Sequence, residues 1–155
     1  MVLDKVFSSK NIILNIQSKD KDSLFEELVD SILKVYPNIN RKEALDALHD
    51  RESKMTTGIM HGIAVPHASC PSSSDTVGAI GICRDGMDYN SLDGHPVNYV
   101  FMLLSNPTET EKHLAVLKDL SSVLQNPSFT KDLESAATSE EAHELLVRYE
   151  SNLLN

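Results

Sequence analysis

The sequence has few of the features that mark secreted or membrane proteins. It contains only two cysteines, Cys70 and Cys83, in 155 residues. We therefore expect free thiols rather than a disulfide framework. No run of about 18 apolar residues is present that could span a bilayer, and residues 1–8 contain no apolar signal core. These absences predict a cytoplasmic protein without membrane insertion.

Basic residues are also scarce. The chain has 14 Lys and Arg against 23 Asp and Glu, a net charge of −9, and no Lys/Arg cluster dense enough to neutralise a row of phosphates. Nucleic acid is therefore not an expected partner. Hydrophobic residues make up 41% and charged residues 24%, as in an ordinary globular protein. The length predicts one domain over residues 1–155, with residues 152–155 frayed.

The first third of the chain predicts a strand followed by two helices. Residues 11–16 are an apolar, β-branched run between polar residues, which is typical of a buried strand. Apolar residues at helical spacing then follow Ser18, a possible N-cap, and Pro37 ends that helix. A second helix is predicted to begin at Asn40, which has a glutamate three residues later, and to end near Arg51.

The remainder predicts three strands and then three helices. The strands cover residues 63–65, 76–83 and 97–104. The last of them is almost continuously apolar, as expected of a central strand covered on both faces. The helices cover residues 108–124, 129–133 and 138–149, with capping pairs Thr108–Glu111 and Thr138–Glu141 and a stop at Asn126 and Pro127. The order β-α-α-β-β-β-α-α-α predicts an α/β fold with helices on both faces of a mixed sheet.

One of the six histidines, His67, has a setting typical of a functional site. It follows an apolar strand and Pro66, whose ring fixes φ and removes a backbone donor. A neutral imidazole offers a lone pair near neutral pH, because its ordinary pKa is about 6.5. Phosphoryl transfer needs little more than in-line positioning and donors around the phosphoryl oxygens. The candidates for such donors are Arg51, Thr56 and Thr57, whereas His49, His95 and His143 are interpreted as structural.

Several segments around His67 form a signature in one fixed order. They are Arg51 with Glu52, residues 57–59 (TGI), 62–67 (GIAVPH), 94–97 (GHPV) and 113–117 (HLAVL). In this order they resemble the fructose/mannitol-type enzyme IIA domains of the bacterial phosphotransferase system. The resemblance covers nearly the whole chain. It implies a three-layer α/β/α sandwich and a phosphoryl relay that uses no metal, nucleotide or other cofactor.

The resemblance also implies roles for single residues. His67 falls on the histidine that receives phosphate from the phosphocarrier protein HPr, and His113 on a second histidine that supports it. Arg51 and Thr57 fall on its polar partners. The implied acceptor is a cysteine of an enzyme IIB domain. In the nitrogen-type branch of the family, the same domain would instead control partner proteins through its phosphorylation state. These residues hold no IIB cysteine motif, so a transport role requires further domains on other chains.

The chain departs from the family pattern at two places. Met60 and His61 stand where the family usually has glycine and then asparagine or glutamate, and residues 68–69 (AS) replace a frequent glycine and lysine. His61 could add a donor to the phosphoryl site or face solvent from its loop.

A metal site is the third alternative. His61, His67 and Cys70 have ligand chemistry, with five and two intervening residues. Only three ligands cluster, and no fourth follows at a familiar spacing. The apolar strand explains His67 without a metal, so no metal ligand is assigned.

Overall fold

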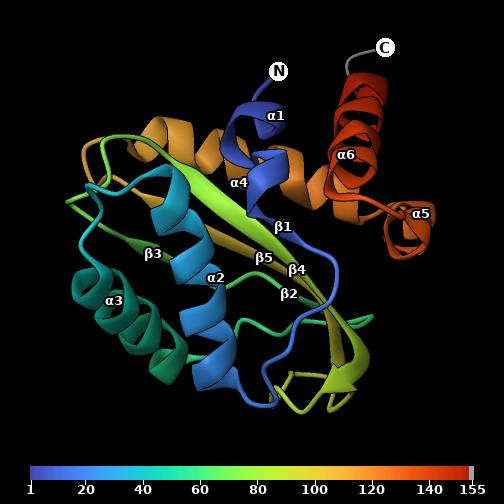
Figure 1. Cartoon of the computed structure of the whole chain (residues 1–155), viewed down its shortest axis with the longest axis horizontal. Helices are drawn as coiled ribbons and strands as arrows, with labels where there is room; N and C mark the ends of the chain where they lie inside the picture. The colour runs from blue at the N-terminus through green and yellow to red at the C-terminus, as the bar shows by residue number, and fades with distance from the viewer. Residues whose placement is uncertain (154–155) are drawn as a thin grey trace.

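A computed structural model describes residues 1–153, and it shows a mixed β-sheet between two layers of helices (Figure 1). Strand β4 (Val77–Met87) runs antiparallel to β5 (Val97–Ser105), and the other strand pairs are parallel. The sheet order is β1 (Ile12–Ile13), β4, β5 and β2 (Ile63–Ala64), with β3 (His67–Ser69) also paired to β5. The predicted α/β fold with a mixed sheet is confirmed.

Strand β5 lies at the centre of this sheet, as its apolar sequence predicts. Its alternate residues enter two separate cores: Val100, Met102 and Leu104 pack into one, and Phe101 and Leu103 into the other. All five side chains are fully buried. Burial of such a side chain stabilises the fold by about 1.5–3 kcal/mol, so both helical layers depend on this strand.

The two cores are covered by different helices, which gives the three layers. Helices α2 (Lys21–Val35) and α3 (Arg41–Lys54) cover the face seen in Figure 1. The opposite face is covered by α1 (Leu3–Val6), α4 (Thr110–Leu124), α5 (Pro127–Ser135) and α6 (Ser139–Leu153). Within residues 1–153, none of these helices has the length and apolar character needed to cross a membrane.

In the first third of the chain, side-chain caps determine where the helices begin. Helix α2 is capped by Asp20, whose carboxylate accepts a backbone N–H from the first turn at 2.8 Å. The predicted cap, Ser18, was wrong, because its hydroxyl donates to Glu27 instead. Asn40 caps α3 as predicted, at 2.9 Å from its donor. That helix continues to Lys54, beyond its predicted end.

Three predicted strands differ in extent. The strand over residues 11–16 is only Ile12–Ile13, preceded by a 3-10 turn (Ser9–Asn11). The strand predicted over residues 63–65 is Ile63–Ala64. It is separated from the next short strand, His67–Ser69, because Pro66 has no N–H to contribute to the ladder. Strand β4 extends past residue 83 to Met87 through an irregularity after Ile82.

In the last third of the chain, the observed helix caps also differ from the predicted ones. Helix α4 begins at Thr110 without the predicted cap, because the hydroxyl of Thr108 donates to Asn106. Helix α4 ends at Leu124, just before the predicted stop, and Asn126 caps α5, with Pro127 in its first turn. Helix α6 extends to Leu153, so it includes the first two of the residues that were predicted to fray. Residues 154–155 lie outside the described residues.

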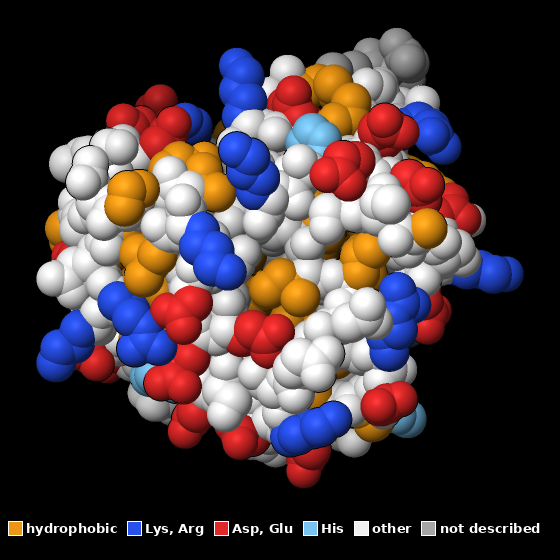
Figure 2. Space-filling view, viewed as in Figure 1, with side chains coloured by type: hydrophobic (Ala, Val, Ile, Leu, Met, Phe, Trp, Pro, Cys, Tyr) orange, Lys and Arg blue, Asp and Glu red, His pale blue; other side chains and the backbone are white. Residues whose placement is uncertain are grey.

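Charges alternate on the face that α2 and α3 present to solvent. Figure 2 shows Lys and Arg side chains interspersed with Asp and Glu. Arg41 pairs with Asp30 at 2.7 Å, and Lys42 with Asp46 at 2.6 Å, on exposed positions. The charges of Arg41 and Lys42 are therefore partly balanced by carboxylates on the same face.

Candidate functional site

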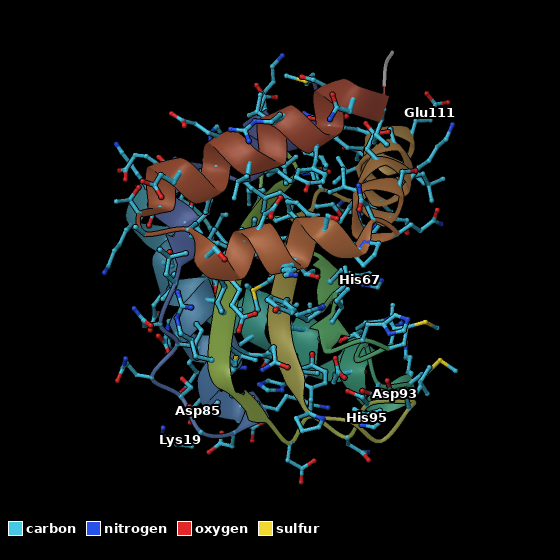
Figure 3. All side chains as sticks on the ribbon, turned by 90° about the vertical axis from the view of Figure 1, so that its right-hand side faces the viewer. Lys19, His67, Asp85, Asp93, His95 and Glu111 are labelled. Atoms are coloured by element: carbon cyan, nitrogen blue, oxygen red, sulfur yellow. The ribbon has the colours of Figure 1, made fainter. Side chains whose placement is uncertain are left out.

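His67 is the first residue of the edge strand β3, opposite Leu103 of β5. The next residue, Ala68, packs into the core beneath α2 and α3. Because side chains alternate along a strand, the half-buried ring of His67 faces the α4 layer. In Figure 3, His67 lies on the same side of the view as Asp93 and His95.

A hydrogen bond fixes the proton on the His67 ring. Its Nδ1 lies 2.8 Å from the carbonyl oxygen of Val65. A carbonyl only accepts, so Nδ1 of the neutral ring carries the proton and Nε2 holds the lone pair. The arrangement provides a nucleophilic nitrogen whose orientation is set by the backbone two residues earlier.

The second predicted histidine, His113, lies beside the first. It projects from the first turn of α4, and its ring centroid is 5.9 Å from that of His67. Its Nδ1 is buried, and no hydrogen-bond partner for it lies within the described chain. Burial lowers the pKa of His113 below its ordinary value of 6.5, and His67 lowers this pKa further. His113 is therefore neutral at neutral pH.

We expect His113 to titrate below pH 6.5, and its pKa to rise in a His67→Ala variant. The rise follows because removal of His67 removes a like charge when both rings are protonated. Burial, the larger cause of the shift, remains, so the pKa stays below 6.5. NMR titration of the ring carbon protons measures both values. An unchanged pKa in the variant would show that the two rings do not interact.

A pocket of about 320 Å³ opens beside His67, between the end of α3, the following loop and α4. Its lining includes Arg51, Thr56 and Thr57 together with Val65, Leu92 and Leu117. The structure thus brings the predicted residues Arg51, Thr56, Thr57 and His67 to one pocket. His113 contacts His67 but does not line this pocket. His61 lines an adjoining pocket of about 310 Å³ that shares Ile59, Val65, Ser121 and Leu124.

The guanidinium of Arg51 serves its own helix and leaves donors for a ligand. Its Nη1 donates to the carbonyl of Met55, the residue that follows α3, at 2.8 Å. A guanidinium has five N–H donors in a planar fork. One is used at the helix end, so the others are available to an anion in the pocket.

The described residues do not assemble the alternative metal site. No group of three His, Cys, Asp or Glu side chains within residues 1–153 could hold an ion. Cys70 is buried beside Ser72 and Glu43, in the core under α2 and α3, whereas His61 is exposed. Cys83 is also a free, buried thiol, as predicted.

A comparison with known protein families matches residues 5–149 to the family described as "Phosphoenolpyruvate-dependent sugar phosphotransferase system, EIIA 2". The chain belongs to this EIIA family. Over 136 residues it is 36% identical to the fructose-specific EIIABC component of Bacillus subtilis. That alignment covers 88% of this chain but 21% of the Bacillus protein, so the chain spans about a fifth of that relative's length.

Two solved structures extend the comparison. The nitrogen regulatory protein IIA-Ntr of Neisseria meningitidis matches with a TM-score of 0.87 at 26% identity, over 94% of this chain and 99% of that one. Enzyme IIA for mannitol from Escherichia coli, in its complex with phosphorylated enzyme IIB, matches with a TM-score of 0.76 at 20% identity, over 91% and 98%. Both matches confirm the three-layer EIIA fold.

The unusual His61 of this EIIA chain keeps a demanding backbone conformation. It lies in the left-handed region at φ 57°, which favours glycine and asparagine and is less favourable for other residues. The following Gly62 is also left-handed, at φ 75°. The loop before β2 thus turns tightly in spite of the departure from the family pattern, and His61 lines the adjoining pocket rather than the His67 pocket.

Sequence reasoning missed two residues that hold Thr57 at the His67 pocket, Glu52 and Tyr89. The buried Thr57 hydroxyl donates to Glu52 at 2.6 Å and lies 2.8 Å from the hydroxyl of Tyr89. Burial alone would raise the pKa of Glu52, but hydrogen bonds from Thr57 and Lys21 lower it overall. Burial also raises the pKa of Tyr89 far above its usual range. Glu52 adjoins Arg51 in the signature, which was the one signal available.

Proposed function

We propose that this EIIA chain accepts a phosphoryl group on Nε2 of His67 from phosphorylated HPr and passes it to a cysteine of an enzyme IIB domain. The hydrogen bond from Nδ1 to Val65 carries the proposal, because it leaves the Nε2 lone pair free. In the first transfer this lone pair forms the P–N bond, while the donor atom of HPr keeps the electrons of the broken bond. In the second, a thiolate forms the S–P bond, and the electron pair returns to Nε2.

Arg51 and His113 have the chemistry to stabilise the phosphoryl group. The free donors of Arg51 suit the bidentate binding of phosphoryl oxygens. Phosphorylation adds a charge of about −1.5 to −2 next to His113. This negative charge raises the pKa of His113, which then gains a proton and donates to the phosphoryl oxygens. His113 is therefore positively charged only while His67 carries the phosphoryl group, and its charge then balances part of the negative charge of that group.

The surface around the pocket supports a protein donor and acceptor. Met55, Ile59 and Leu92 line the pocket and are 58%, 43% and 61% exposed. Large apolar side chains grouped on a surface indicate a contact with another protein. Such a contact would also exclude water from the phosphohistidine during transfer.

The phosphorylated chain has two proposed roles, transfer to an enzyme IIB domain and regulation of partner proteins. The 36% identity to a fructose-specific EIIABC component favours transfer to an enzyme IIB in fructose- or mannitol-type sugar uptake. The higher TM-score with IIA-Ntr favours a regulatory role, in which the phosphorylation state controls the binding of partner proteins. We place sugar uptake first, because sequence identity compares the side chains that form the site, whereas a TM-score compares only the path of the backbone.

The test supplies phosphoenolpyruvate, enzyme I and HPr to the chain and measures acid-labile phosphate. Stoichiometric labelling of the wild type is expected, and its absence would overturn the relay. The labelled chain is then offered each enzyme IIB domain of the host. Rapid loss of label to one of them supports sugar uptake. Retention of the label, with partner binding that depends on it, supports regulation.

A further inference from the structure

The carboxylate of Glu52, near the end of α3, lies behind the His67 pocket and accepts several hydrogen bonds. The side chain of Glu52 is 7% exposed and pairs with Lys21 of α2 at 3.1 Å. Its two oxygens accept the backbone N–H of Thr57 at 2.8 Å and the Thr57 hydroxyl at 2.6 Å. The hydroxyl of Tyr89 lies 3.3 Å from the same carboxylate, and the ammonium of Lys21 lies 4.2 Å from the centre of the Tyr89 ring.

These contacts lead by consecutive hydrogen bonds to the nucleophile. Thr57, held at its N–H by Glu52, accepts the N–H of Val65 on its carbonyl at 3.1 Å. The carbonyl of Val65 then accepts Nδ1 of His67 at 2.8 Å. Thr57 is therefore held by hydrogen bonds to Glu52 and to Val65, and Val65 by hydrogen bonds to Thr57 and to His67. The position of the Val65 carbonyl, which sets the His67 tautomer, is thus connected to a carboxylate thirteen residues earlier in the chain.

We propose that Glu52 is a positioning residue for phosphoryl transfer, which acts through Thr57 and Val65 to keep the proton of His67 on Nδ1. The inference rests on the proposed function in that His67 is taken as the acceptor. A ring released from Val65 can carry its proton on either nitrogen. A proton on Nε2 occupies the lone pair that must attack phosphorus, so each such molecule is inactive.

The Thr57 hydroxyl has a different part in this arrangement from the one that the family signature suggests. It contacts Glu52 and Tyr89, and the connection toward His67 runs through the Thr57 backbone. The Thr57 side chain holds the turn through Glu52 and Tyr89, and the Thr57 carbonyl holds the backbone of Val65. Removal of the Glu52 carboxylate releases both.

The experiment compares wild type with Glu52→Ala, Glu52→Gln and the control Asp46→Ala. Asp46 is also a carboxylate on α3, but its side chain is 65% exposed. Nitrogen NMR of chains with ¹⁵N-labelled histidine measures the tautomer of His67, and single-turnover assays with phosphorylated HPr measure the transfer rate against HPr concentration. Unfolding curves show that each variant is folded at the assay temperature.

In Glu52→Ala we expect a lower fraction of the Nδ1-protonated ring and a transfer rate reduced roughly tenfold to a hundredfold, with little change in KM. Glu52→Gln keeps a neutral acceptor for Thr57, so about a threefold loss is expected, since charge-assisted bonds are about twice as strong as neutral ones. Asp46→Ala should match wild type. If Glu52→Ala does not fold, the same two readouts are taken from Glu52→Gln.

A merely structural Glu52 predicts a different result. The variants would then unfold more easily, but the folded fraction would keep the wild-type tautomer and rate, and that outcome would overturn the proposal. The tautomer measurement needs no phosphoryl donor. If the wild type accepts no phosphate, the relay fails, while a tautomer change in Glu52→Ala would still support the positioning of His67 by Glu52.

Discussion

His67→Gln is expected to abolish acid-labile phosphate on the chain, with a loss of about a thousandfold or more in transfer rate. A glutamine amide nitrogen has no available lone pair, so it cannot form the P–N bond. The fold should persist, because His67 is half-buried at a sheet edge and its backbone pairing to β5 is unchanged. Labelling by phosphoenolpyruvate, enzyme I and HPr measures the loss.

The same change at other histidines provides the control. His61 and His95 are exposed, and neither lines the His67 pocket. His61→Gln and His95→Gln should therefore label within about twofold of wild type, as expected for surface substitutions. Label retained on His67→Gln but lost on His61→Gln would move the acceptor to the adjoining pocket.

The fold class was predictable because the strands and long helices have clear hydrophobic periods. Helix α1 was not, since the start of this four-residue helix is held by a distant partner. The backbone N–H groups of Val2 and Leu3 donate to the buried carboxylate of Glu150, near the other end of the chain, at about 3.1 Å. No local pattern in residues 1–8 reports such a contact.

The site shows the same division between local and distant information. The pocket brings together His67 and Arg51, which belong to a local signature. Tyr89 is absent from that signature, and it reaches Thr57 from 32 residues away. The signature also could not show where the Thr57 hydroxyl points. The types of residue were predictable from sequence, but the hydrogen bonds that orient them depend on how the end of α3 packs against the segment that follows β4.

Leu92→Asp is expected to raise the KM for phosphorylated HPr about tenfold or more, with little change in the rate at saturation. Leu92 lines the His67 pocket and is 61% exposed, so the substitution should cost little folding stability. In a docked complex, however, an aspartate here would lose its water without a partner, which is unfavourable for binding. It would also repel the phosphoryl group carried by HPr. Transfer rates over a range of HPr concentrations separate KM from the saturating rate.

Leu153→Asp is the matched control for this effect. Leu153 is 43% exposed at the end of α6, on the opposite side of the molecule from β3 in Figure 1. It receives the same chemical change on a surface that the proposed partner does not touch. Its KM should remain at the wild-type value. Equal KM values for the two variants would place docking away from the apolar surface around Leu92, even if His67 is the phosphoryl acceptor.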